Sequence, residues 1–94
     1  MSFLACLATK DDLVQIVEFL TAPEIDGSFV RPLSERPESI PARVRRRYDE
    51  GFWVISTDKT TDGLAGVRAG IYHPEDEVVM FSTLAVHPLY RGNG

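Results

Sequence analysis

The last residues of the sequence, Arg91-Gly92-Asn93-Gly94, are of types that bind phosphate. Glycine leaves backbone N–H groups uncovered and lets a phosphate oxygen approach the chain closely. Loops of this kind usually open a helix, whose N-terminal end favours anions. Hairpin turns use the same residues, so the spacing by itself predicts either a phosphate-binding loop or a tight turn.

Few other residues have the chemistry for proton transfer. His73 and His87 titrate in the useful pH range, but each precedes a proline, and structural roles are favoured for both. Glu77 could accept a proton, although it lies near the start of an expected strand. The single cysteine, Cys6, falls in an apolar run and is predicted to be a small buried residue rather than a nucleophile.

Composition limits the class of protein. The chain has 94 residues, 44% of them hydrophobic and 26% charged, which predicts one small globular domain over residues 1–94. A net charge of −4 does not favour nucleic acid or an anionic membrane as partner. No stretch approaches the roughly 20 apolar residues of a membrane span. One cysteine cannot form an internal disulfide, so a cytoplasmic location is expected.

The first half of the chain reads as a strand followed by two helices. Residues 3–8 predict a buried strand, and Thr9 with Asp12 then resembles a capping box. One helix should follow to residues 21–23, with an apolar face of Leu13, Ile16, Val17 and Leu20. After a loop over 24–37, a second helix should start at Ser39 and end at Gly51, with Ile40, Val44 and Tyr48 on one face. Its arginines, Arg43, Arg45, Arg46 and Arg47, are expected to form a solvated helix face.

The second half reads as three strands joined by hairpins. Strands are predicted over 52–56, 64–72 and 77–86, with turns over 58–63 and 73–76. Phe52 and Trp53 are expected in the core, while Gly66 and Gly70 indicate a bulge or a close backbone approach. The order β-α-α-β-β-β predicts an α+β fold, an antiparallel meander with helices packed on it.

The run from Thr83 to Gly94 is the most specific feature. It resembles the acetyl-coenzyme A signature of the GNAT superfamily of N-acetyltransferases, in which a strand ending Leu-Ala-Val-His-Pro is followed by an aromatic residue and Arg-Gly-x-Gly-x-Gly or Ala. The match extends through Gly94, and the element order is similar to the first half of that fold. The resemblance implies a C-terminally incomplete N-acetyltransferase domain of the α/β sandwich type over residues 1–94.

The resemblance also implies a mechanism and a binding site. Acetyl-coenzyme A would be the co-substrate, without a metal, and an amine acceptor would attack its thioester directly. The Leu84 backbone N–H would face the thioester carbonyl and hold the developing oxyanion. The fourth strand would lend its backbone to the pantetheine arm. The cofactor-binding residues would be Leu84, Ala85, Val86, Arg91, Gly92, Asn93 and Gly94.

The catalytic base and the acceptor pocket are less defined. Some relatives place a base at positions matching Met80 and Ser82, neither of which can take a proton from an ammonium; Glu77 is a weak candidate and the base stays unassigned. The loop over 24–33 is similar in place to the acceptor-lining loop of relatives. Its candidate contacts are Asp26, Phe29 and Arg31, and the alternative that each is an ordinary loop residue is favoured over a role in the pocket.

Two further hypotheses stay open. The chain could bind coenzyme A or a nucleotide without chemistry. It could also be an interaction protein, because the strand over 77–86 has an apolar edge that invites pairing with a second copy. A homodimer or larger assembly through this edge is therefore expected. The acceptor could be an antibiotic, a protein N-terminus, a lysine, an amino acid or a polyamine.

Overall fold

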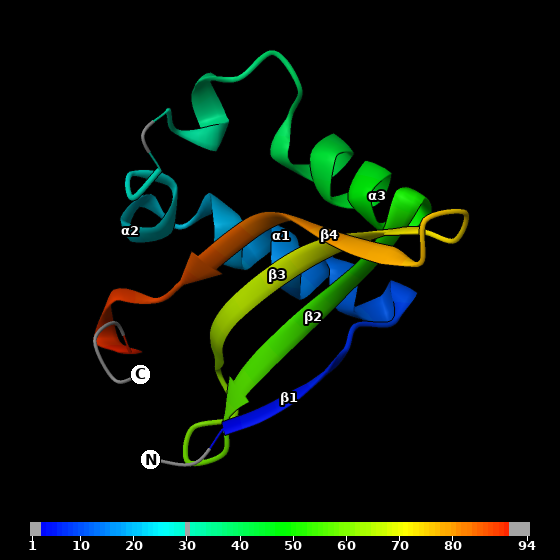
Figure 1. Ribbon diagram of the computed structural model, residues 1–94. Coiled ribbons are helices and arrows are strands. Elements are labelled where there is room, and N and C mark those ends of the chain that lie inside the picture. Colours follow the sequence, from blue (N-terminus) through cyan, green and yellow to red (C-terminus); the bar gives the residue numbers. More distant parts are fainter. Residues whose placement is uncertain (1–2, 30, 91–94) are drawn as a thin grey trace.

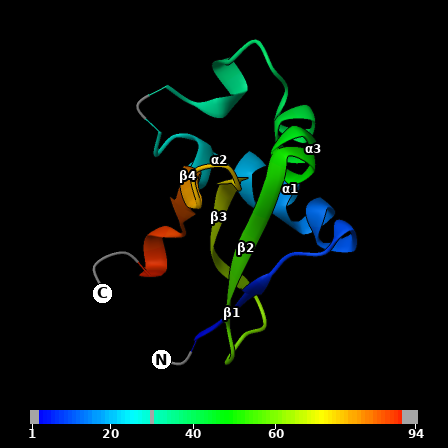
Figure 2. The ribbon, with the colours of Figure 1, turned by 45° about the vertical axis from the view of Figure 1, so that its right-hand side comes forward.

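A computed structural model describes residues 3–29 and 31–90 (Figure 1). Four antiparallel strands form one sheet in the order β1-β2-β3-β4. Their bounds are β1 Phe3–Leu7, β2 Gly51–Asp58, β3 Leu64–His73 and β4 Val78–Val86. The helices are α1 Leu13–Thr21, α2 Pro23–Asp26 and α3 Ile40–Glu50. The predicted α+β meander is confirmed, with α1 and α3 on one face of the sheet and no described helix on the other (Figures 1 and 2).

Local signals in the sequence account for α1. A 3₁₀ turn over Lys10–Asp12 leads into the helix, and the Asp12 carboxylate accepts a hydrogen bond from the Thr9 backbone N–H at 2.8 Å. This satisfies a donor that the first turn leaves free. The predicted apolar face is confirmed, since its members Leu13, Ile16 and Leu20 are buried.

Helix α3 begins where the capping signals place it. The Ser39 hydroxyl accepts from the Ala42 N–H at 3.3 Å, and Pro41 occupies the first turn, where a missing donor costs little. Val44 is buried, and its carbonyl accepts a hydrogen bond from the Trp53 indole N–H at 3.0 Å. That contact ties α3 to β2 in the middle of the core.

The core lies between the helices and one face of the sheet. Trp53 is fully buried, as predicted, whereas Phe52 is only half-buried because neighbouring strand residues face opposite sides. The fully buried side chains of largest volume are Trp53, Ile16, Leu20, Ile25, Leu33 and Val44.

The first strand and its cysteine differ from the prediction. Residues Phe3–Leu7 do form a strand, but all five are exposed, and Cys6 is an exposed free thiol. The reason is topological, because β1 is the outer strand of the sheet and α1 lies over the neighbouring strands. An apolar run predicts a strand but does not say which place in the sheet that strand takes.

The segment predicted as a loop over 24–37 contains short helical turns. Helix α2 starts with Pro23 in its first turn, and a 3₁₀ turn covers Leu33–Glu35. Ile25 and Leu33 are both buried, which anchors the segment to the core. Among the described residues, no helix is long and apolar enough to cross a membrane.

Gly51 follows α3 as predicted but for a different physical reason. Its φ of −164° is extended backbone, so it is not a left-handed helix cap; it begins β2 instead. A Cβ at Gly51 would lie 1.9 Å from the Gly70 carbonyl oxygen, and one at Gly70 would lie 2.4 Å from the Phe52 ring. These glycines allow β2 and β3 to approach closely, as the strand pattern indicated for Gly70.

The arginine run on α3 is only partly solvated. The side chains of Arg45 and Arg46 are 54% and 39% exposed, but those of Arg43 and Arg47 are 13% and 16% exposed. Arg46 forms an ion pair with Glu38 at 2.7 Å, a residue of the segment before the helix. Arg43 also lies 3.9 Å from Glu38, whereas Arg47 pairs with Glu50 of α3 itself, so two arginines of the run hold the preceding segment against the helix.

Candidate functional site

The end of β4 carries the residues that the sequence singled out. Leu84 pairs with Arg68, Ala85 with Val67 and Val86 with Gly66 on β3. Leu84 is 55% exposed, while Ala85 is buried against the helices. Because β4 is an edge strand, its second side does not pair with another described strand. The backbone around Leu84 thus lies at the border of the sheet.

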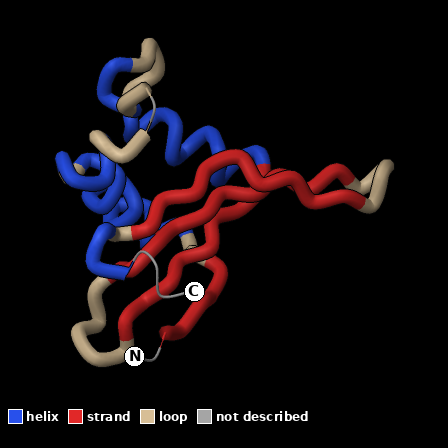
Figure 3. The backbone as a smooth tube through the Cα atoms, turned by 60° about the vertical axis from the view of Figure 1, so that its left-hand side comes forward, coloured by secondary structure: helices blue, strands red, loops and turns tan. Residues whose placement is uncertain are grey.

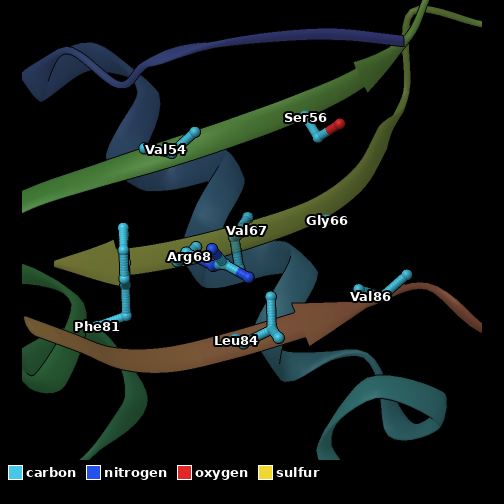
Figure 4. Close-up of a pocket in the computed structure, with 8 residues that line it drawn as sticks. All are labelled: Val54, Ser56, Gly66, Val67, Arg68, Phe81, Leu84 and Val86. Carbon is cyan, nitrogen blue, oxygen red and sulfur yellow. The ribbon is translucent and has the colours of Figure 1, made fainter. Parts of the chain in front are cut away.

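A shallow apolar groove of about 390 Å³ lies on the sheet face opposite the helices (Figure 4). Its lining comes from three adjacent strands and includes the predicted Leu84. The full set is Val54, Ser56, Gly66, Val67, Arg68, Phe81, Leu84 and Val86. A Cβ at Gly66 would lie 3.0 Å from the Ala85 carbonyl oxygen, so glycine allows β3 and β4 to approach closely beside the groove. The groove and the edge of β4 form one continuous surface.

Arg68 is the charged side chain of this groove. Its guanidinium carbon lies 4.7 Å from the centre of the Phe81 ring, a cation–π contact, and Figure 4 shows Arg68 between Phe81 and Leu84. Sequence reasoning assigned neither Arg68 nor Phe81 to this site, although Phe81 belongs to the apolar edge expected over residues 77–86. The alternation of Arg68 with the apolar Val67 and Ala69 was the available signal for a residue facing away from the core.

A bulge in β4 explains why Phe81 and Leu84 share the groove. Gly70 pairs with Phe81 and Ala69 with Thr83, so Ser82 is an extra residue in the β4 backbone. Strand residues three apart would otherwise point to opposite faces. The bulge resets the alternation and brings both apolar side chains to the uncovered face.

Hydrogen bonds hold the turn after β4 against the sheet. The His87 N–H donates to the Ala65 carbonyl at 2.8 Å, and the Tyr90 N–H donates to the His87 carbonyl at 2.9 Å, which closes a 3₁₀ turn over Pro88–Tyr90. The His87 ring accepts from the Leu89 N–H at 3.2 Å and lies 3.8 Å from the Glu24 carboxylate. These contacts agree with the structural role expected for His87.

Tyr90, at the end of this turn, contacts two residues that are distant in the sequence, Asp58 and Phe3. Its hydroxyl donates to the Asp58 carboxylate at 2.7 Å, and its ring packs edge-on against Phe3 with 5.4 Å between centres. Asp58 is 4% exposed and also accepts from the Thr60 N–H at 2.8 Å. The Tyr90 hydroxyl lowers the pKa of Asp58, and the carboxylate in turn raises the pKa of Tyr90.

The three candidate acceptor contacts do not line the groove. Asp26 accepts from both the hydroxyl and the N–H of Ser34, at 2.5 and 3.0 Å, and the hydroxyl lowers the pKa of Asp26. Phe29 packs against the core, and Arg31 is exposed. Asp26 therefore stabilises the conformation of its own loop. A role in acceptor binding stays a prediction for all three residues.

Glu77 lies in the turn before β4, where its φ of 53° is in the left-handed region. Seven residue steps separate it from Leu84, which is roughly 20 Å along an extended strand. A direct proton transfer between an amine beside Leu84 and Glu77 is not favoured at that separation. Arg91, Gly92, Asn93 and Gly94 lie outside the described residues. Within residues 3–29 and 31–90, no three His, Cys, Asp or Glu side chains gather as metal ligands.

Comparison with solved structures identifies the fold. The chain is similar to a GNAT family acetyltransferase from Staphylococcus aureus, with a TM-score of 0.60, 14% identity and coverage of 100% of this chain and 69% of that one. An N-acetyltransferase from Staphylococcus aureus Mu50 matches with a TM-score of 0.62, 16% identity and coverage of 100% and 59%. An acetyltransferase from Trypanosoma brucei matches at 0.59, with 17% identity and coverage of 99% and 66%.

These matches define the class of fold. Antiparallel sheet, helix placement and element order are those of the GNAT acetyltransferases, as the sequence resemblance predicted. The chain spans 59–69% of the length of these structures. No family model matches the sequence, and no curated protein matches it significantly.

Proposed function

We propose that this chain belongs to an acetyl-coenzyme A-dependent N-acetyltransferase that transfers an acetyl group to an amine. The main support is the juxtaposition at the end of β4. An edge backbone at Leu84 borders an apolar groove, and a turn anchored to β3 leads directly into the glycine-rich residues 91–94. The GNAT fold adds weight to this interpretation.

The residues of the chain would act by position rather than by proton transfer. The Leu84 N–H would donate to the carbonyl oxygen of the acetyl group, where negative charge develops as the amine attacks. Apolar side chains around it, including Phe81 and Val54, would exclude water and strengthen that hydrogen bond. The glycines of 91–94 would offer backbone N–H groups to the phosphates. The tetrahedral intermediate would then break its C–S bond and expel the coenzyme A thiolate, which would take up the proton that the amine nitrogen loses.

Calorimetric titration of the full chain with acetyl-coenzyme A at low salt tests the binding step. We expect a micromolar dissociation constant, and at least tenfold weaker binding for Gly92→Val, whose side chain would obstruct the approach of phosphate. Gly63→Val is the matched control, because Gly63 lies exposed in the β2–β3 turn. ATP should bind much more weakly than acetyl-coenzyme A. Equal binding of both, unaffected by Gly92→Val, would instead indicate nonspecific attraction of anions.

A second assay separates an enzyme from a binding module. Release of the coenzyme A thiol would be followed with a panel of amines, including an amino acid, a polyamine and a lysine peptide. Amine-dependent thiol release that disappears with Gly92→Val would support transferase activity. Tight binding without release under any amine would favour a module that holds coenzyme A without chemistry.

Self-association is a second candidate function, and the exposure of β4 favours it. Five apolar side chains of this edge strand, Val78, Val79, Met80, Phe81 and Leu84, are each 44–57% exposed. The stretch from Val78 to Leu84 contains no charged residue that would discourage pairing with another strand. We propose that a second copy of the chain pairs with this edge, burying the apolar side chains of both.

A further inference from the structure

Arg68 on β3 is the direct cross-strand partner of Leu84 on β4. Figure 3 shows helices α1 and α3 along one side of the strands, opposite the face that carries the apolar groove. Both residues line that groove. The pairing of β3 with β4 is continuous from Gly66 to Ala69, so hydrogen-bonded and non-hydrogen-bonded pairs alternate regularly along this stretch.

One backbone hydrogen bond fixes the order of this alternation. The His87 N–H donates to the Ala65 carbonyl at 2.8 Å, which makes these two residues a hydrogen-bonded pair in the same register as the strand. Three residues earlier on β4, Leu84 therefore forms a non-hydrogen-bonded pair with Arg68. In such a pair the Leu84 N–H points away from β3, towards the border of the sheet, and the two side chains stand at the closest cross-strand spacing.

The Arg68 guanidinium has no acidic partner. Within residues 3–29 and 31–90 it forms no ion pair and no side-chain hydrogen bond, and it lies against the Phe81 ring instead. The aromatic contact orients the guanidinium but does not occupy its five N–H donors as a carboxylate would. The arginines of α3, by contrast, each pair with a carboxylate of the chain: Arg43, Arg45, Arg46 and Arg47.

An arginine without an acidic partner, at the wall of an apolar groove, is complementary to a carboxylate. The fork of guanidinium donors matches the two carboxylate oxygens, and the apolar neighbours strengthen the attraction by limiting access of water. Figure 4 shows the Arg68 side chain extending towards Leu84. An anion bound there would lie beside the group that the Leu84 N–H holds.

We propose that Arg68 is a specificity-determining residue that binds the carboxylate of the amine acceptor, so that the acceptor is an amino acid rather than a polyamine. This rests on the proposed function, in which the Leu84 N–H holds the acetyl carbonyl. The amine nitrogen would attack beside Leu84 while the carboxylate of the same molecule is held by Arg68. The apolar lining of the groove favours an amino acid with an apolar side chain.

Two probes that differ in one group test the contact without any chemistry. N-acetylleucine carries an acetyl carbonyl and a carboxylate, whereas N-acetylleucinamide has the same body and no charge. Binding to the full chain is followed by NMR through the Leu84 amide signal and the Arg68 side-chain N–H signal. We expect N-acetylleucine to bind at least about tenfold more tightly, because only its carboxylate forms a charge-assisted pair. Equal affinity for the two probes would overturn the proposal.

Variants of two arginines assign the effect to one residue. Arg68→Gln should weaken binding of N-acetylleucine about tenfold and leave N-acetylleucinamide within twofold, which also shows that the variant is folded. Arg68→Lys keeps the charge without the planar fork and should lie between the two. Arg45→Gln is the matched control, because the Arg45 side chain is 54% exposed on α3, away from the groove. If Arg45→Gln weakened N-acetylleucine as much as Arg68→Gln, the attraction would be general and the proposal would fall.

Acetyl transfer separates this proposal from the proposed function. With acetyl-coenzyme A, leucine should have at least about tenfold higher kcat/KM than leucinamide or a polyamine, and Arg68→Gln should remove the difference by raising KM for leucine. Equal use of the three amines would overturn the carboxylate preference and leave the transferase function standing. If no amine is acetylated while N-acetylleucine still binds through Arg68, the carboxylate site stands and the proposed function falls.

Discussion

Self-association through β4 can be tested by placing a charge in the middle of the edge. Val79→Lys puts an ammonium group among Val78, Met80 and Phe81, where strand pairing would remove it from water. Val14→Lys is the matched control, since Val14 is 65% exposed on α1, on the helix-covered side of the sheet. Both variants replace a valine with a lysine, so they add the same charge at different places.

The magnitude follows from the exposure of the edge. Fully burying one such side chain stabilises by about 1.5–3 kcal/mol, so burying the exposed half of each contributes about 1 kcal/mol. The five residues of one copy then contribute about 5 kcal/mol, and two copies about 10 kcal/mol. Association costs at least about 4 kcal/mol, which leaves roughly 6 kcal/mol and a dissociation constant of tens of micromolar.

Sedimentation velocity over about 5–300 µM covers this range. The unmodified chain should change from monomer to dimer, and Val14→Lys should behave in the same way. Val79→Lys should remain monomeric throughout, because both copies lose apolar burial and gain a desolvated charge. A monomer at every concentration of the unmodified chain would refute the reasoning. The reasoning would also be refuted if Val14→Lys dissociated the dimer to the same extent as Val79→Lys.

Two predictions concern stability. Trp53→Phe should lower the free energy of unfolding, measured by urea unfolding, by about 3 kcal/mol. Roughly 2 kcal/mol comes from lost apolar burial and about 1 kcal/mol from the lost hydrogen bond to Val44. A loss under about 1 kcal/mol would mean that the indole is not a core contact. Asp26 has a pKa below its unfolded value, so its contribution is present above the unfolded pKa and is lost as the pH falls through the folded one. Between about pH 5 and pH 2, the unmodified chain should lose stability more steeply than Asp26→Asn, and parallel curves would exclude a stabilising contact with Ser34.

Several features could be predicted because they depend on neighbours in sequence. The apolar spacing and the cap at Thr9 predict α1, and Ser39 with Pro41 predicts the start of α3. The resemblance of residues 83–94 to the GNAT signature predicted a fold that structural comparison confirmed. The acceptor candidates and the cofactor contacts stay predictions, and residues 91–94 lie outside the described part of the chain.

The wrong predictions for Cys6, the arginine run and Gly51 share one cause, which is that each depends on contacts with residues distant in the sequence. Cys6 is exposed because β1 is an edge strand, although its apolar neighbours suggested burial. Arg43 is largely covered because the segment carrying Glu38 folds against α3, whereas charge alone suggested a solvated face. Gly51 is needed for its contact with Gly70 on β3, a residue 19 positions away, rather than for the helix end.

The sequence by itself determined the type and order of the four strands and of helices α1 and α3, together with the signature over residues 83–94, because these follow from the local periodicity, capping and turn chemistry of consecutive residues. Only the tertiary structure decided which side chains meet. The extra residue Ser82 turns Phe81 and Leu84 to the same face as Arg68, and pairing across the sheet brings Tyr90 to Asp58. Such meetings depend on strand register and long-range packing, which residue types and local spacing do not specify.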